Sequence, residues 1–135
     1  MRQNKIKYKE TIKVINLAND LSAYTLRILC NENLFPKRSR WLMAGKIADL
    51  VNDFHSSIHT ANEIRVSTRA EAEDRHRYQT LAMAQLQAIE EKIELAKSVL
   101  DIDVDRLDHW AGMWLEEEKL LRSWISKDQN RYSEL

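Results

Sequence analysis

The stretch YQTLAMAQLQAIEEKIELAKSVL, residues 78–100, decides the fold of this chain. Its apolar positions recur at steps of four, four, three, four, three and four, and they are Tyr78, Ala82, Leu86, Ile89, Ile93, Ala96 and Leu100. This spacing is close to a heptad repeat, which aligns one apolar face along an α-helix. Upstream, Thr68 and Glu71 have the spacing of a capping box. The pattern therefore predicts a helix over residues 68–100 with one buried face.

Three more amphipathic helices are predicted by the same spacing, over residues 8–32, 36–65 and 103–127. The second begins at Pro36, because proline is favoured in the first turn of a helix. The last begins at one of three aspartates that can cap it, which are Asp101, Asp103 and Asp105. We expect the polar segment 69–77 to project past the core or to meet another chain, and the tail after residue 127 to fray.

The composition favours an all-α chain, since the 135 residues include only two glycines and one proline. Turns between strands use these two residues heavily. Connections of about three to six residues force consecutive helices to be antiparallel neighbours. A chain of this length fits one domain. The sequence thus predicts a single up-down-up-down antiparallel four-helix bundle over residues 1–135.

Cysteine usage and hydropathy favour a cytoplasmic protein. Cys30 is the only cysteine, so no internal disulfide can form, and its place in a helical pattern indicates a small buried hydrophobe. The first ten residues lack the apolar stretch of a secretory signal. No apolar run approaches the roughly 18 residues of a membrane span, so we expect no membrane association.

The charges are divided unevenly along the chain, although the formal net charge is zero. The first 46 residues hold ten bases and three acids, a balance of +7, and the remaining 89 hold eleven bases and eighteen acids, a balance of −7. The basic third can attract phosphate or an acidic protein, and the remainder a basic partner. Four arginines near the turn after residue 65 alternate with acids and indicate a salt-bridge network; they are Arg65, Arg69, Arg75 and Arg77.

The basic third contains two groups of candidate binding residues, one at the start of each of the first two helices. They are Lys5, Lys7, Lys9 and Lys13 in the first group, and Lys37, Arg38, Arg40, Trp41 and Lys46 in the second. Antiparallel helices start at opposite ends, so we expect two separate patches. In the second group, N–H groups of the helix start favour phosphate, and Trp41 can stack on an unpaired base. The alternative is a solvated helix start with Trp41 covering the end of the core.

Catalytic chemistry is not indicated. His55 and His59 share one helix face, which suits a metal ion, but no further ligand is identifiable by spacing. Glu73 and His76 form a single Glu-x-x-His, whereas di-iron bundles need two such motifs and two more glutamates. The sequence contains no phosphate-binding glycine loop and no nucleophile elbow. We therefore predict a non-enzyme without a metal or cofactor.

The last predicted helix carries an aromatic group that has two interpretations. Its members are Trp110, Met113, Trp114 and Trp124. They cover more of the helix than one buried stripe needs. This width fits a large core, or it fits a subunit interface, where aromatic residues and methionine are enriched. We favour the interface.

Three short segments carry a resemblance to a known family: FPKRSRW at residues 35–41, the Ala61–Asn62 pair, and SWISK at residues 123–127. Together with the order and length of the helices, they resemble the accessory variability determinant (Avd) proteins of diversity-generating retroelements. The similarity in helix order extends over nearly the whole chain. Ribosomal intervening-sequence four-helix proteins share this architecture and are the second match.

The Avd resemblance implies a homopentameric, non-catalytic barrel of four-helix bundles. Proteins of that family associate with the retroelement reverse transcriptase and its template-repeat RNA, and they enable error-prone cDNA synthesis. The matching positions Pro36, Lys37, Arg38 and Arg40 would lie at the partner-facing surface, and Ser123, Trp124 and Ile125 would serve packing. The best-known members are markedly basic, whereas this chain is neutral overall. That departure leaves room for contact mainly with a basic polymerase, through the acidic last two helices.

Two functional hypotheses follow. In the first, the chain is an oligomeric adaptor that assembles a reverse transcriptase with RNA. In the second, it is a structural homo-oligomer of the ribosomal intervening-sequence type without a nucleic-acid role. There, the basic third of one subunit pairs with acidic helices of its neighbour.

Overall fold

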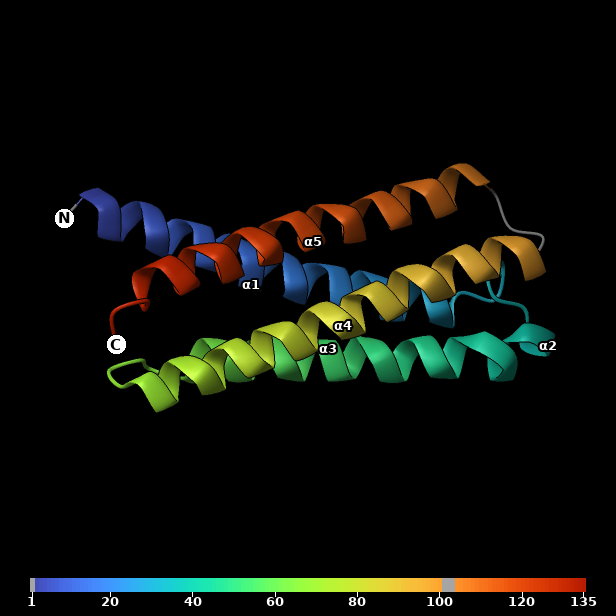
Figure 1. Ribbon diagram of the computed structural model, residues 1–135. Coiled ribbons are helices and arrows are strands. Elements are labelled where there is room, and N and C mark those ends of the chain that lie inside the picture. Colours follow the sequence, from blue (N-terminus) through green and yellow to red (C-terminus); the bar gives the residue numbers. More distant parts are fainter. Residues whose placement is uncertain (1, 101–103) are drawn as a thin grey trace.

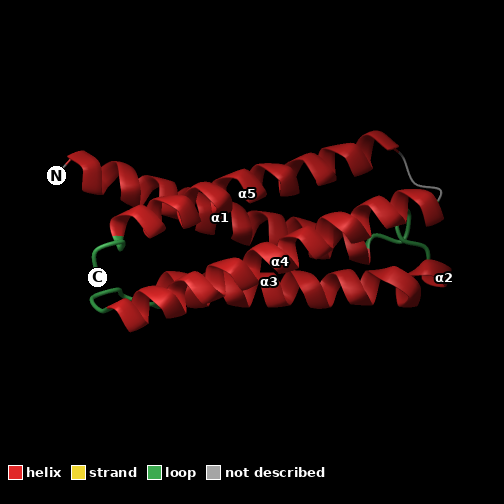
Figure 2. Cartoon of the chain, viewed as in Figure 1, coloured by secondary structure: helices red, strands yellow, loops and turns green. Residues whose placement is uncertain are grey.

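The computed structural model describes residues 2–100 and 104–135, and the side chains at 2–12, 39, 41 and 104 lie outside the described part. Throughout the described residues the chain is helical, without strands, as predicted (Figure 2). Four long helices pack against one another: α1 (Arg2–Cys30), α3 (Gly45–Glu63), α4 (Arg69–Val99) and α5 (Val104–Arg131).

The long helices lie along one common direction, and consecutive helices point opposite ways (Figure 1). α1 packs against α3 and α5, and α4 packs against the same two helices. One end of the molecule holds the start of α1, the α3–α4 turn and the end of α5, and we call it the terminal end. The other holds the connection from α1 to α3 and the start of α5, and we call it the α2 end.

Within the core, the prediction from sequence agrees best with the structure at the heptad face of α4. Ala82, Leu86, Ile89, Ile93 and Ala96 are all fully buried. Across from them, Phe54 of α3 meets Trp114 of α5 edge to face, with ring centroids 5.3 Å apart. Fully burying one large apolar side chain contributes about 1.5–3 kcal/mol, so this row holds the four helices together.

The capping box predicted before α4 is confirmed. Thr68 Oγ1 accepts a hydrogen bond from the Glu71 backbone N–H at 3.2 Å, and Glu71 Oε1 accepts one from the Thr68 N–H at 3.0 Å. Hydrogen bonds from Ser67 and Thr68 also hold the pKa of the Glu71 carboxyl below its usual value. Two N–H groups that the first helical turn leaves without partners are thereby satisfied.

The segment predicted as one helix over residues 36–65 is divided into three parts. It consists of the short α2 (Lys37–Ser39), the π-helical turn η1 (Arg40–Ala44) and α3. A π-helical turn accommodates an extra residue and rotates the helix that follows. The backbone nevertheless stays helical without a break from Lys37 to Glu63, and a phosphate site at its first N–H groups stays a prediction.

The ends of two other helices also differ from the prediction. α1 begins at Arg2 instead of residue 8, and α5 continues to Arg131 instead of fraying after residue 127. Asp101 and Asp103 lie outside the described residues. Cys30, expected to be buried, is exposed because it ends α1. None of the described helices contains an 18-residue stretch apolar enough to cross a membrane.

Candidate functional site

The second predicted group of basic residues lies at the α2 end. Lys37, Arg38 and Lys46 are exposed, and within the described residues their side chains form no hydrogen bond or ion pair. Their charge is therefore available to a partner. The side chain of Trp41 is outside the described part, so its predicted stacking role stays a prediction.

Arg40 has a different role from the one that the sequence suggested. Its guanidinium donates to two backbone carbonyls, from NH2 to Cys30 O at 3.0 Å and from Nε to Phe35 O at 3.3 Å. It also lies 3.7 Å from Glu32 Oε1. A cation at these carbonyls satisfies acceptors that the end of a helix leaves unpaired. Arg40 thus closes the turn between α1 and α2, which corrects its assignment as a partner-binding residue.

The first predicted basic group is remote from the second. Lys13 is exposed on α1, and the side chains of Lys5, Lys7 and Lys9 lie outside the described residues. The start of α1 and the position of α2 are at opposite ends of the bundle (Figure 1). The two groups therefore do not combine into one patch, as expected for antiparallel helices.

A cavity of about 500 Å³ opens at the α2 end. One of its lining residues, Phe35, comes two residues before Lys37 in the sequence. Buried side chains form its floor, and they are Phe35, Leu107 and Trp110. Phe35 meets Trp110 edge to face at 6.1 Å, and Trp110 Nε1 donates to Thr25 Oγ1 at 2.9 Å. These contacts fix the floor before any ligand arrives.

The rim of this cavity is polar and carries both signs of charge, because Asp105 lines it beside two arginines. Arg27 of α1 and Arg106 of α5 both line it, both are exposed, and neither forms an ion pair within the described residues. His109 and Asn31 line it as well. Lys37 and Arg38 are not among the lining residues, but they follow the floor residue Phe35 closely in sequence and add two exposed cations at this end. Sequence spacing missed this site, because its walls are about 70 residues apart along the chain.

The tryptophans interpreted as a subunit interface belong to the core of the single chain. Trp110, Trp114 and Trp124 are 1%, 0% and 4% exposed, and Met113 is half-buried against the same core. Indoles that are already covered by their own chain offer no surface to a second subunit. The structure therefore corrects the interface interpretation. The reason is that the bundle is wide enough to enclose three indoles on one helix.

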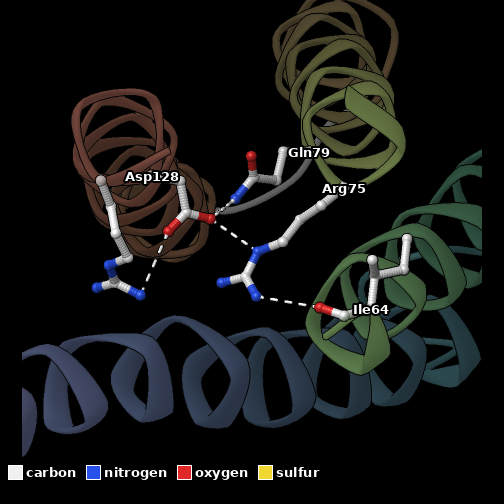
Figure 3. A network of polar contacts seen from close by, with 5 residues as sticks. Ile64, Arg75, Gln79 and Asp128 are labelled. Atoms are coloured by element: carbon white, nitrogen blue, oxygen red, sulfur yellow. Dashed lines mark hydrogen bonds and ion pairs between the residues drawn. The ribbon is translucent and has the colours of Figure 1, made fainter. Parts of the chain in front are cut away.

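A buried ionic network occupies the terminal end (Figure 3). Asp128 Oδ2 accepts hydrogen bonds from Arg75 Nε at 2.7 Å and from Gln79 Nε2 at 2.8 Å. Arg75 NH1 also donates to the Ile64 carbonyl at 3.3 Å, which ties the end of α3 to α4. On the other side of the carboxylate, Arg131 NH1 is 3.8 Å from Asp128 Oδ1. The network thus joins three helices.

This network corrects two expectations about polar segments. Arg75 and Asp128 are only 9% and 4% exposed, so neither segment 69–77 nor the start of the C-terminal tail projects freely from the core. The Arg75 guanidinium also lies 5.0 Å from the centre of the Trp124 ring. A smaller cavity, of about 280 Å³, adjoins the network. The predicted salt-bridge network is present only in part: Arg69 pairs with Glu73 and Arg77 with Asp74, whereas Arg65 forms no ion pair within the described residues.

His55 and His59 are held by one asparagine of α1. Asn19 Oδ1 is 2.8 Å from His55 Nε2 and 2.7 Å from His59 Nε2, so both rings donate to the same oxygen. Burial, and secondarily the neighbouring His59, lower the pKa of His55. Within the described residues no group of three or more histidine, cysteine, aspartate or glutamate side chains is arranged to hold a metal ion. The pair therefore links α1 to α3.

Two acids on α5 and α4 have strongly raised pKa values. Glu117 is fully buried between Trp114 and Leu121 on the buried face of α5, and neither carboxyl oxygen has a hydrogen-bond partner among the described residues. Burial, with a smaller effect of Glu116, raises its pKa to about 9. Burial and the nearby Glu118 raise the pKa of Glu90 to about 7. Helical spacing places residue 117 on the buried face, three residues after Trp114 and four before Leu121, but its identity as glutamate hid this position from the sequence analysis.

Comparisons of the chain with protein-family models, with curated proteins and with solved structures give no match. An assignment of function therefore depends on the geometry of the α2 end and on the short segments that resemble Avd proteins.

Proposed function

We propose that this chain is a cytoplasmic, non-catalytic accessory protein that binds RNA through the α2 end and associates with a reverse transcriptase. In this proposal the up-down-up-down bundle is an inert scaffold that displays charge. It self-associates as a homopentamer, the oligomeric state that the Avd resemblance implies. Its partners are the polymerase and its template-repeat RNA, and the complex supports mutagenic cDNA synthesis.

The observation that carries the proposal is the contrast in how cations are used. At the terminal end Arg75 is neutralised by Asp128, whereas Lys37, Arg38 and Lys46 at the α2 end are exposed and unpaired within the described residues. Unpaired surface cations bind phosphate by releasing the counterions that RNA has condensed around it. Arg27 and Arg106 extend the same positive region around the cavity.

The test is a titration of single-stranded RNA with the Lys37→Ala, Arg38→Ala double variant at several salt concentrations. Each phosphate contact on a single strand contributes about 0.7 to the slope of log affinity against log salt. We expect weaker binding and a slope that is smaller by about 1.4. The control is Arg65→Ala, Lys119→Ala, which removes two exposed, unpaired cations elsewhere. Equal affinity and slope for the wild type and the α2-end variant would refute RNA binding at this end.

Association with the polymerase is tested separately, because a basic polymerase can dock on acidic surface without RNA. Charge reversal of exposed acids on α4 and α5, Glu91→Lys with Glu116→Lys, should reduce co-purification with the reverse transcriptase after ribonuclease treatment. The variant Glu63→Lys, on α3, is the control. Undiminished recovery of the polymerase would remove α4 and α5 from the proposal.

The second candidate function, a structural homo-oligomer, is favoured by one face of α4. Leu81, Leu95 and Val99 are 45%, 48% and 55% exposed, and they lie on the side of α4 away from its buried heptad face. Leu95 and Val99 are neighbours one helical turn apart, and an exposed apolar patch of this kind is typical of protein interfaces. A stable oligomer in native mass measurement, together with no affinity for RNA at physiological salt, would select this function over the first.

A further inference from the structure

We infer that the cavity at the α2 end binds an unpaired base of single-stranded RNA, whose phosphates lie on the surrounding cations. This inference rests on the proposed function and names the part of the RNA that the site takes. It begins from the chemistry of the cavity. A volume of about 500 Å³ lies within the range of small-molecule sites, about 300–1,000 Å³, and a planar base fits it.

The floor of the cavity is apolar and closed, since Phe35 and Trp110 are 0% and 1% exposed and bound the space without offering a ring face to a ligand. Phe35 and Trp110 are fixed against each other at 90°, and the Trp110 N–H is bound by Thr25. Above them, three half-buried apolar side chains line the entrance, and they are Tyr24, Ile28 and Leu34. Among these Tyr24 carries an aromatic ring, and stacking on such a ring binds every base and depends little on sequence.

The rim favours an anionic ligand, because its two arginines outnumber Asp105, the one acid among the described residues that line the cavity. Arg27 and Arg106 approach the cavity from two different helices, and both are free of ion pairs within the described residues. The apolar lining and the two arginines belong to one cavity, so a ligand with a flat apolar body and negative groups on its edge satisfies both features. A nucleotide within a strand has this form. Lys37 and Arg38, which follow the cavity in sequence, then continue the path of the backbone.

Two other occupants have weaker support. An apolar side chain of a partner protein would fill the floor, but it would leave the two rim arginines without an anion. A free nucleotide matches the cavity and the arginines, but it would not use Lys37 and Arg38. The strand is the ligand that uses all four cations and the floor together.

The experiment compares two probes of about 12 nucleotides, an oligoadenylate and an abasic strand with the same number of phosphates. The full-length protein carries Tyr24→Leu, which keeps an apolar side chain and removes the ring. Stacking on one aromatic side chain supports an expected loss of at least about fivefold for oligoadenylate, and no change for the abasic strand. The control is Tyr78→Leu, because Tyr78 is also half-buried against the core, on α4. Thermal unfolding checks that both variants fold.

A second variant tests the rim. Arg27→Gln, Arg106→Gln should weaken oligoadenylate more than it weakens the abasic strand, because the arginines hold the phosphates of a base already inserted. Equal affinity of the wild type for the two probes, or no effect of Tyr24→Leu, would overturn the inference. Equally tight binding of adenosine monophosphate would overturn the assignment to a strand. If Lys37→Ala, Arg38→Ala still weakens RNA binding, the proposed function survives the loss of this inference; if it does not, both fail.

Discussion

The two ends of the bundle use the same kinds of charged residue in opposite ways. At the terminal end the Arg75 guanidinium is buried and reaches Asp128 and the Ile64 carbonyl. At the α2 end Lys37 and Arg38 are exposed and reach nothing within the described residues. Charges that are buried with a partner fix how helices meet, whereas charges without one remain free to recruit a ligand. A cation in this protein is therefore structural where a partner lies next to it and available for binding where none does, whether it is a lysine or an arginine.

The largest expected effect comes from breaking the pair at the terminal end. Asp128→Ala leaves the buried Arg75 cation without its counterion, and such a loss costs about 3–5 kcal/mol. Urea unfolding measures it. Asp74→Ala is the matched control, since its ion pair with Arg77 is exposed and should change stability by less than about 0.5 kcal/mol. If the two variants unfold at the same urea concentration, the terminal network is not structural.

Glu117 is buried, like the Arg75–Asp128 pair at the terminal end. Like Lys37 and Arg38 at the α2 end, however, it has no partner within the described residues. Its folded pKa of about 9 exceeds the ordinary value of 4.5, so the folded state holds a proton that the unfolded state releases between these values. Stability should be full below about pH 4.5 and fall as pH rises toward 9. Glu117→Gln should remove this decline and stabilise the protein at pH 7 by about 1–3 kcal/mol. Urea unfolding across pH measures the decline, with the exposed Glu116→Gln as the control. A wild type whose stability does not fall above pH 5 would contradict the buried, unpaired state of Glu117.

Arg40 is an exception at the α2 end, because it has partners. Lys97 is another, since its Nζ lies 2.8 Å from Asp108 Oδ1 and 2.9 Å from Glu94 Oε1. Arg40→Ala removes hydrogen bonds to Cys30 O and Phe35 O and should destabilise the chain by about 1–2 kcal/mol, partly screened by solvent. Arg40→Lys keeps the charge but loses the paired geometry, and should recover only part of the loss. Full recovery of the melting temperature by lysine would show that charge alone matters at this turn.

The smallest change in stability is expected for the exposed cations Lys37 and Arg38. Lys37→Ala, Arg38→Ala should change the free energy of unfolding by less than about 0.5 kcal/mol, since neither side chain has a partner within the described residues. The same variant should lose RNA affinity, as proposed above. Destabilisation as large as that of Arg40→Ala would place these two residues in the structural group and erase the contrast between the ends.

Much of the fold was predictable because it depends on local spacing. The heptad positions of α4 and the Thr68–Glu71 cap are set within a few residues, and both were predicted. The split of the second helix by η1 was not, since a π-helical turn leaves no periodic mark in a short stretch. The tail after residue 127 looked disordered because its residues are polar. Asp128 is ordered there by partners about 50 residues away in sequence.

The candidate site shows the same division. Lys37 and Arg38 were found from sequence because clusters of like charge are visible in it. Arg27 and Arg106 were not, because the end of α1 meets the start of α5 only in the folded bundle. The aromatic group on α5 was recognised but misassigned, since its composition is the same in a core and in an interface.

The sequence by itself determined that the chain is helical, where most of its helices lie and that its cations gather at the front, because periodicity, capping and composition act within a few turns. Which charged side chains pair with one another depends on how the helices pack. The tertiary structure buried Arg75 with Asp128, enclosed Glu117, turned Arg40 back onto its own chain and left Lys37 and Arg38 exposed beside an aromatic cavity. The physical reason is that the energy of a charge depends on burial and on its nearest partner, and both are fixed when distant helices pack together.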